Sequence, residues 1–365
     1  MHVCQLLIGS PLILINQKNY GPAIWSGLTS LALVCTVAAT PAHAQILEAA
    51  GSRALGMGGA FVAVASDSSA TWWNPAGIAA GPFVDIAWAR SVTERPEELP
   101  AARDRASWFA LATPPAAFSY YRLRITDIQP FDPTGEDAAG RENRRAGVPV
   151  RSLSASLLGV TLVRTLSPGV HAGTTLKYVR GTLRHGREDS LAPPSDLLAL
   201  GDDYEDGDAQ GRLDLDVGLM AVAGPIRVGG VVKNLREPEF EAPGLTPDAA
   251  PNRMILPRQI RVGVALVPEG TTGVPLTVAF DADVRTYSTP AGERRMVALG
   301  VEHWLFTRRV GVRAGGRMNT RGERELTATA GLTVALRGGA YLDGHVIRGR
   351  EIDERGWGLA SRISF

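Results

Sequence analysis

The chain has 365 residues, of which 45% are hydrophobic and 21% charged, with 41 glycines and 24 prolines. Its 38 basic and 37 acidic side chains nearly cancel, so the charge balance argues against a nucleic-acid partner. No segment after residue 44 offers about 18 uncharged apolar residues in a row, which excludes helical membrane spans from that part of the sequence.

The first 44 residues differ in composition from the rest of the chain. Their only charged residue is Lys18, residues 23–39 are uncharged and mostly apolar, and the segment ends in Ala42-His43-Ala44. A charged residue, an apolar core and a small-x-small exit are the parts of a secretory signal peptide. We therefore expect residues 1–44 to direct export and to be cleaved near Ala44. An uncleaved membrane anchor is the alternative, because the apolar stretch reaches the minimum spanning length of about 17 residues.

Residues 45–82 fit no strand pattern and carry two conspicuous strings. Residues 54–65 read ALGMGGAFVAVA, and residues 72–78 read WWNPAGI. The glycines in the first string, Gly56, Gly58 and Gly59, allow backbone angles closed to other residues and a close approach of two backbones. In the second string, Asn74 before Pro75 favours an extended or turn conformation. This composition suits tight packing, and we expect residues 45–82 to form a plug, either rigid or able to move during transport.

Alternation of apolar and polar residues dominates the chain after residue 82. The segments 213–219, 276–285, 310–315 and 326–336 each place apolar residues on one face and polar or tiny residues on the other. Several keep this period for ten or more residues, which exceeds the usual soluble strand of about 5–6 and suffices to cross a bilayer at a tilt. A membrane barrel is therefore favoured over a soluble sandwich.

The sequence predicts fourteen strands of this kind. They run near 83–90, 106–112, 115–124, 151–164, 169–183, 211–223, 225–235, 257–268, 273–287, 293–305, 307–318, 323–336, 338–349 and 354–365. Connections after even-numbered strands are short, whereas those after odd-numbered strands include the long segments 91–105, 125–150, 184–210 and 236–256. Short periplasmic turns and long outer loops are typical of bacterial barrels with an even strand number. We therefore predict an all-β transmembrane antiparallel barrel over residues 83–365.

The two strings in residues 54–78 resemble the N-terminal hatch of the FadL/PorV superfamily of outer-membrane β-barrels. In that superfamily a GMGGAF string and then an NPAG string precede a fourteen-stranded barrel. Residues 256–259, 300–304 and 313–316 are similar to strands of the PorV/PorQ branch. The resemblance implies a location in the bacterial outer membrane and leaves two functions open. One is transport of hydrophobic small molecules; the other is a PorV/PorQ-like interaction protein serving protein secretion or surface attachment, with no small-molecule substrate.

The final strand carries a second resemblance. Its apolar face ends in a C-terminal aromatic residue, and such a strand resembles the signal read by the barrel-assembly machinery. The residues expected to form this assembly signal are Trp357, Leu359, Ile363 and Phe365.

The polar faces of the predicted strands carry charges that we expect to point into the barrel lumen. Opposite charges on neighbouring strands pair across a sheet and satisfy polar groups of a plug. A charge ladder that selects substrates is the alternative. The expected lumen charges are Asp214, Asp216, Arg261, Asp281, Asp283, Arg285, Glu302, Arg313 and Arg317.

Signals for catalysis and cofactors are weak. The chain lacks a phosphate-binding loop and a nucleophile elbow, its histidines show no metal-ligand spacing, and both cysteines, Cys4 and Cys35, lie in the signal segment. We therefore predict no enzymatic activity, no cofactor and no metal. The acidic segment 202–208 lacks the register of an EF-hand loop, so calcium binding there is left open.

The expected partners follow from the predicted location. They are outer-membrane lipid and lipopolysaccharide, the barrel-assembly machinery, and either a hydrophobic small molecule or a secreted protein. A basic cluster at the end of the second long connection and the start of the next predicted strand fits lipopolysaccharide phosphates or a simply hydrated loop. Its members are Arg141, Arg144, Arg145 and Arg151.

Overall fold

The computed structural model describes residues 48, 50–96, 101–128, 147–188, 192–204, 207–243, 252–268, 275–289, 291–350 and 353–365. The predicted signal peptide lies outside the described residues. Among the helices in these ranges, none combines the length and the apolar character needed to cross a membrane.

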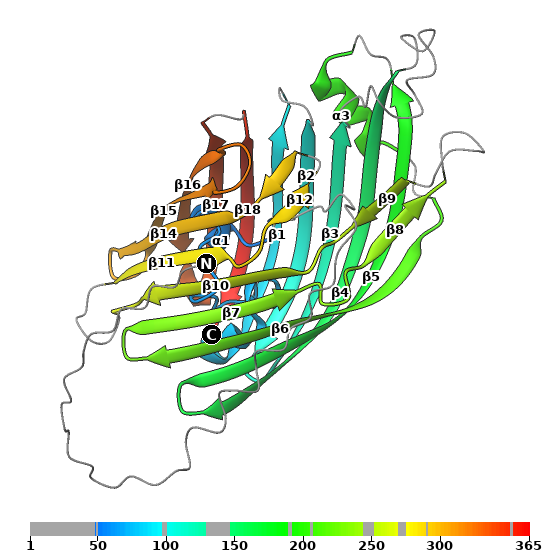
Figure 1. Cartoon of the computed structure of the whole chain (residues 1–365). Coiled ribbons are helices and arrows are strands. Elements are labelled where there is room, and N and C mark those ends of the chain that lie inside the picture. The colour runs from blue at the N-terminus through cyan, green and yellow to red at the C-terminus, as the bar shows by residue number, and fades with distance from the viewer. Residues whose placement is uncertain are drawn as a thin grey trace, which may run out of the picture. The chain divides into compact units, whose positions relative to one another are not determined.

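Fourteen strands close into one barrel, as predicted (Figure 1). Every neighbouring pair is antiparallel, and β1 pairs with β18 to complete the circle. The barrel strands are β1(Asp85–Arg95), β2(Ala102–Thr113), β3(Ala116–Ile128), β4(Val148–Ser167), β5(Val170–Glu188), β6(Gln210–Ala223), β7(Ile226–Lys233), β10(Gln259–Leu266), β11(Leu276–Asp283), β14(Met296–Leu305), β15(Val310–Asn319), β16(Leu326–Ala335), β17(Ala340–Gly349) and β18(Arg355–Ser364).

The two ends of the barrel differ. At one end, here called the turn end, lie the start of β1, the end of β18 and short connections such as the one between β2 and β3. At the opposite end, the loop end, the connections carry additional elements: α3(Pro194–Asp202) and two small hairpins, β8(Glu239–Ala242) with β9(Asn252–Ile255) and β12(Tyr287–Thr289) with β13(Gly292–Arg294). The single-turn η4(Arg337–Gly339) lies at the turn end.

Two strands, β4 and β5, extend further toward the loop end than the alternation of apolar and polar residues predicted. β4 and β5 have 20 and 19 residues and are the longest of the barrel (Figure 1). There β4 reads Val148-Pro149-Val150 and β5 reads Arg184 to Glu188, so neither shows an alternation of apolar and polar residues although the pairing continues. The helix α3 packs against this extension through Leu197 and Leu198, which join Ala101, Ile128 and Val150 in a small apolar cluster.

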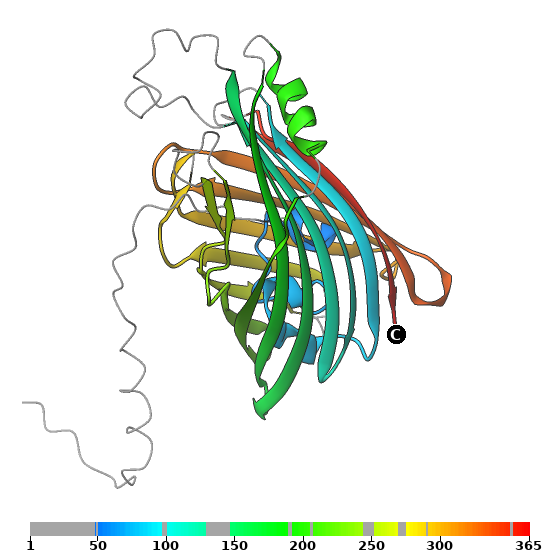
Figure 2. The same ribbon diagram turned by 90° about the vertical axis from the view of Figure 1, so that its right-hand side faces the viewer.

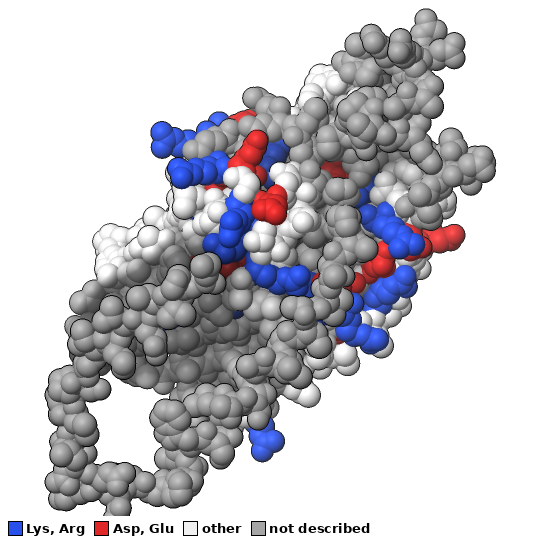
Figure 3. All heavy atoms as spheres, in the orientation of Figure 1, with Lys and Arg blue, Asp and Glu red and all other residues white. Residues whose placement is uncertain are grey.

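Apolar side chains form a belt on the outer surface of the barrel. Large residues that alternate with buried ones are 36–65% exposed along many barrel strands, as at Trp88, Leu158, Phe280 and Val346. Soluble surfaces rarely expose so large a continuous apolar area, and such a belt is typical of a lipid-facing barrel. On the face drawn in Figure 3, the charged side chains gather toward the loop end.

The chain before β1 lies inside the barrel. This inner segment, residues 50–84, contains α1(Ser52–Gly56), α2(Ala70–Trp73) and η1(Pro75–Ala80). The helix α1 contacts β15 to β18, and η1 contacts β4 to β6 (Figure 2). Its residues are almost all buried up to Ile78. The described part of the predicted plug therefore occupies the lumen; its role as a plug stays a prediction.

Candidate functional site

Glycines on the inner wall allow the backbone of the inner segment to lie directly against the strands. A Cβ atom added at any of these wall positions would come within 2.1–3.1 Å of an atom of the inner segment. At all of these positions except Gly331 the distance is below 3.0 Å, which real Cβ atoms essentially never show, so a larger side chain would require the segment to shift. The wall glycines are Gly173, Gly218, Gly229, Gly300, Gly315 and Gly331.

The glycines of the inner segment complete this contact. Gly56 faces Gly331, whose Cα would lie 3.0 Å from a Cβ at position 56. Gly58 combines a φ of +70° with the backbone of Gly316, 2.7 Å from where its Cβ would stand. A left-handed conformation and a close backbone contact both favour glycine. Gly59 also has a positive φ, and its nearest neighbour is the ring of Trp73. The glycines in the strands were a sequence signal for this close contact, and the search for motifs did not use it.

Asn74 ties the inner segment to the wall. Its amide nitrogen donates to the carbonyl oxygens of Val62 at 2.8 Å and Leu219 at 3.0 Å, and its side-chain oxygen accepts from the backbone of Ala76 at 3.2 Å. Pro75 then starts η1, where its missing N–H leaves no donor unsatisfied. Buried polar groups need such partners, so this one side chain satisfies three backbone groups at once.

Asp281 of β11 holds the middle of the inner segment. One carboxylate oxygen accepts from the backbone N–H groups of Phe61 and Val62, each at 2.8 Å. The side chain is 1% exposed, so these two donors replace water at that oxygen.

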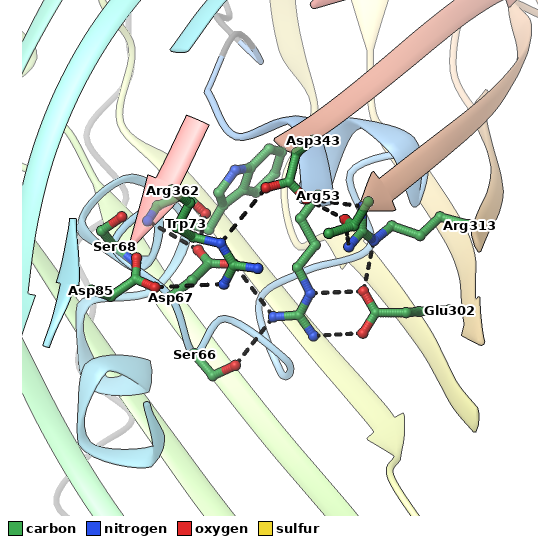
Figure 4. A network of polar contacts seen from close by, with 12 residues as sticks. Arg53, Ser66, Asp67, Ser68, Trp73, Asp85, Glu302, Arg313, Asp343 and Arg362 are labelled. Carbon is green, nitrogen blue, oxygen red and sulfur yellow. Dashed lines mark hydrogen bonds and ion pairs between the residues drawn. The ribbon is translucent and has the colours of Figure 1, made fainter. Parts of the chain in front are cut away.

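A network of buried charges joins the inner segment to the turn-end half of the barrel (Figure 4). Arg53 donates to both carboxylate oxygens of Glu302, at 2.8 and 2.9 Å, and also contacts Asp67 at 3.4 Å. Arg313 donates to Glu302 at 2.6 Å and lies 3.5 Å from Asp343. Bidentate arginine–carboxylate pairs fix geometry as well as supplying energy. The network therefore positions α1 against β14 and β15.

A second charged cluster lies toward the loop end, where the inner segment begins. The carboxylate of Glu48 pairs with Arg261, with Arg317 at 2.6 Å and with Arg294 at 3.3 Å. Burial by itself would raise the pKa of Glu48, but the three guanidinium groups outweigh it and hold the pKa well below its usual range. No sequence motif indicated a role for Glu48, because this residue precedes the glycine-rich string at residues 54–65.

Acid should weaken the anchoring of the inner segment through Glu48. A depressed pKa in the folded state contributes stability above the unfolded value of about 4.3, and this stability is lost as pH falls toward the folded value. We expect the urea midpoint of the folded barrel in vesicles to fall between about pH 5 and pH 2. Glu48→Gln should flatten this dependence, whereas the same change at exposed Glu323 should leave it as in the wild type. Equal pH profiles for the two variants would contradict the role given to Glu48.

The other predicted lumen charges are buried, with one difference. Lys177 pairs with Asp214 at 2.8 Å and Asp216 at 2.7 Å, and Arg261 donates to Asp283 at 2.8 Å. Arg285 was expected in the lumen, but it is exposed. The reason is that β11 ends at Asp283, so the alternation no longer sets the direction of the side chain two residues later.

An apolar column fills the lumen along β2 to β5, between the inner segment and the β8–β9 hairpin. At its base, Trp72 of α2 lies 4.9 Å from the ring of Tyr121, which lies 5.8 Å from that of Trp108. At its top, Phe240 of β8 is fully buried, and its ring packs over Gly181 of β5. We define the apolar column as Trp72, Trp108, Tyr121, Leu123, Leu153, Leu157, Val179, Leu183, Phe240 and Met254, all within one cluster of buried residues.

A cavity of about 290 Å³ lies on the turn-end side of the inner segment. Its lining is largely charged or polar and includes Arg53, Arg227, Glu302, Trp304, Arg308 and Arg362. This polar cavity and the apolar column lie on different sides of the inner segment. Passage between them requires the inner segment, or side chains around it, to move.

The predicted assembly-signal residues lie on the outer surface of β18 or directly after it. Trp357, Leu359, Ile363 and Phe365 are 43–67% exposed. The backbone N–H of Phe365 donates to the carbonyl of Val84 at 2.9 Å, which extends the closing pair of strands to the last residue. Their role in assembly stays a prediction.

Neither of the two remaining sequence signals forms a ligand site in the described chain. Asp202, at the start of the acidic segment, ends α3 and pairs with Arg103 and Arg105 at 3.2 and 2.9 Å, while residues 205–206 lie outside the described ranges. Arg151 is 1% exposed and pairs with Asp127; the other three arginines of its cluster lie outside those ranges. No group of three or more metal-binding side chains occurs within the part of the chain that the structure describes.

Comparison with known proteins adds a family and a fold. A family model described as "F plasmid transfer operon, TraF, protein" matches residues 84–283. Among solved structures, the CymD monoaromatic hydrocarbon channel is 12% identical, with a TM-score of 0.58, over 86% of this chain and 96% of that one. A Pseudomonas aeruginosa FadL homologue is 10% identical, with a TM-score of 0.57, over 87% and 99%.

A third solved structure, the Pseudomonas putida toluene transporter TodX, is 12% identical, with a TM-score of 0.51, over 88% of this chain and 98% of that one. At such identities the likeness establishes the FadL-type fold. No curated protein matches the chain.

Proposed function

We propose that this chain, which belongs to the family described as the TraF protein of the F plasmid transfer operon, passes hydrophobic small molecules across the bacterial outer membrane. The apolar outer belt and the fourteen-stranded FadL-type fold support that location. The solved structures with this fold include a toluene transporter and a monoaromatic hydrocarbon channel. Small aromatic hydrocarbons are therefore the first substrates to test.

The apolar column carries the proposal. Ligand sites for apolar molecules are lined by hydrophobic and aromatic side chains, and the column supplies these from the hairpin at the loop end down to Trp72. Its side chains are packed together, so the structure represents a closed conformation of the proposed path. Entry then requires the β8–β9 hairpin to lift Phe240 away from Gly181.

Phe240→Ala should raise uptake of a small aromatic hydrocarbon. Truncating a buried phenylalanine removes about 3–5 kcal/mol of packing, so the closed position of the hairpin becomes less favoured and the column opens more often. The measurement is the initial rate of uptake of radiolabelled toluene into cells with equal amounts of folded barrel. We expect an uptake rate several-fold above that of the wild type. A deletion strain should take up toluene more slowly than the wild type.

The matched control is Phe280→Ala, which makes the same change on the outer surface of β11, where Phe280 is 44% exposed. This variant should take up toluene like the wild type. Uptake that is unchanged in the deletion strain would exclude the transport function.

A second candidate is an interaction protein with no small-molecule substrate, serving protein secretion, surface attachment or plasmid transfer. The family description, which names a plasmid transfer operon, favours it, as does the densely filled lumen. In this case the inner segment is a permanent scaffold and the loop end contacts other proteins. A deletion strain with normal toluene uptake but a changed profile of secreted proteins, or a reduced frequency of plasmid transfer, would favour this candidate over transport.

A further inference from the structure

Three arginines on the outer wall follow the same local pattern. Each lies two residues beyond an exposed aromatic residue in a strand that runs toward the loop end: Arg90 after Trp88 in β1, Arg122 after Tyr120 in β3, and Arg180 after Tyr178 in β5. All three arginines are exposed. Because side chains alternate along a strand, each arginine and its aromatic residue share the outer face.

The strand register places these arginines in one row. Arg90 lies opposite Ser107 of β2, which lies opposite Arg122 of β3. Arg122 lies opposite Ser156 of β4, which lies opposite Arg180 of β5. Arginine and serine thus alternate across five strands, and successive arginines are about 10 Å apart, since neighbouring strands are about 4.8 Å apart.

The aromatic residues form a matching row on the turn-end side. Trp88 lies opposite Phe109, which lies opposite Tyr120, and Leu158 then leads to Tyr178. These five side chains are 37–56% exposed. Tyrosine and tryptophan are enriched where lipid tails meet headgroups. The aromatic row therefore marks an interface level, and the arginine row lies directly beyond it.

The nearby acidic groups are already paired with other arginines. Glu94 pairs with Arg103 and Arg355, at 2.9 and 2.7 Å. Asp202 of α3 pairs with Arg103 and Arg105. Within the described ranges, no acidic side chain forms an ion pair with the three arginines of the row. Their charge is therefore available to an anion from outside the protein.

We propose that this arginine row binds the phosphate groups of a phosphorylated glycolipid of the outer leaflet, whose acyl chains lie against the aromatic row. Guanidinium groups bind phosphate oxygens with two parallel hydrogen bonds, and the intervening Ser107 and Ser156 add hydroxyl donors. The proposal rests on the outer-membrane location proposed above. It assigns lipid recognition to the outer wall of the barrel, since Arg151 of the predicted basic cluster is buried in β4 against Asp127.

The test uses the purified full-length barrel and two probe lipids, diphosphoryl lipid A and the same lipid without phosphates. The row variant Arg90→Gln/Arg122→Gln/Arg180→Gln should bind diphosphoryl lipid A with an affinity at least about tenfold lower than that of the wild type. Each exposed ion pair contributes modestly to binding, but the variant loses three of them. Wild-type binding should weaken as NaCl is raised. The dephosphorylated lipid should bind wild type and variant alike. Native mass spectrometry and titration in detergent supply the affinities.

The control variant changes three exposed arginines near the turn end, Arg164→Gln/Arg309→Gln/Arg337→Gln, and should keep wild-type affinity. If the row variant does not fold, Arg122→Gln alone should give a smaller loss in the same direction. Equal binding by wild type and variant, or equal binding of both lipids by the wild type, would overturn the proposal. The binding experiment involves no transport step. Its result therefore stands even if the uptake experiment excludes the transport function.

Discussion

Gly229→Val should destabilise the folded barrel by at least about 3 kcal/mol, the upper part of the range for overpacking a close-packed interior. Gly229 lies on the inner face of β7, where a Cβ would stand 2.5 Å from the carbonyl oxygen of Val62. The obstacle is backbone, which cannot rotate away as a flexible side chain can. The inner segment must then leave its place or the strand must distort. We expect less heat-modifiable barrel in the membrane and a lower urea midpoint in vesicles.

The adjacent residue supplies the matched control. Gly230 follows in the same strand on the opposite face, and nothing lies within 4 Å of a Cβ placed there. Gly230→Val also introduces a residue that favours strands, so its stability should equal or exceed that of the wild type. If the two valine variants lose stability equally, the loss comes from valine in β7 and not from contact with the inner segment.

Glu302→Gln should cost about 3 kcal/mol, near the lower end of the range for breaking a buried ion pair by removing one partner. The change preserves the shape of the side chain but leaves Arg53 and Arg313 without their shared carboxylate. The cost stays at the lower end because Asp67 still lies 3.4 Å from Arg53 and Asp343 lies 3.5 Å from Arg313. Unfolding in urea, followed by the total tryptophan fluorescence of the chain, measures the loss.

Replacing Arg53 as well should cost less than the two single changes added together. The double variant Arg53→Met/Glu302→Gln removes one uncompensated cation, so its destabilisation should be smaller than the sum of the two single changes. Exposed Glu323→Gln serves as the surface control and should change stability little. Strict additivity of Arg53→Met and Glu302→Gln would show that the network does not act as a unit.

The barrel itself was predictable from residue patterns. Alternation in segments such as 276–285 and 326–336 arises because one face of each strand meets an apolar surrounding and the other meets the lumen. That physical requirement repeats in every strand, so the count of fourteen and their antiparallel order were correct. The loop-end extensions of β4 and β5 were missed because β4 begins with Val148-Pro149-Val150 and β5 ends in the polar run from Arg184 to Glu188, and neither run has a period of two.

The contacts inside the lumen were less predictable from the sequence. Alternation identified Asp281 and Glu302 as inward-facing, but it cannot say that Asp281 accepts from Phe61 or that Glu302 pairs with Arg53, 249 residues earlier. Partners so distant in the chain meet only when the barrel has closed around the inner segment. Arg285 shows the opposite limit, because the direction of a side chain follows the alternation only while the strand continues.

Local physics therefore decided the strands of this protein: the period of two, the glycine-rich string at Gly56 to Gly59 and the turn at Asn74 are all properties of neighbouring residues. Tertiary structure decided which wall glycine receives which part of the inner segment, which charges neutralise each other and which arginines remain available on the outer wall. Those choices depend on strand register, and register is a relation between strands that no single strand encodes.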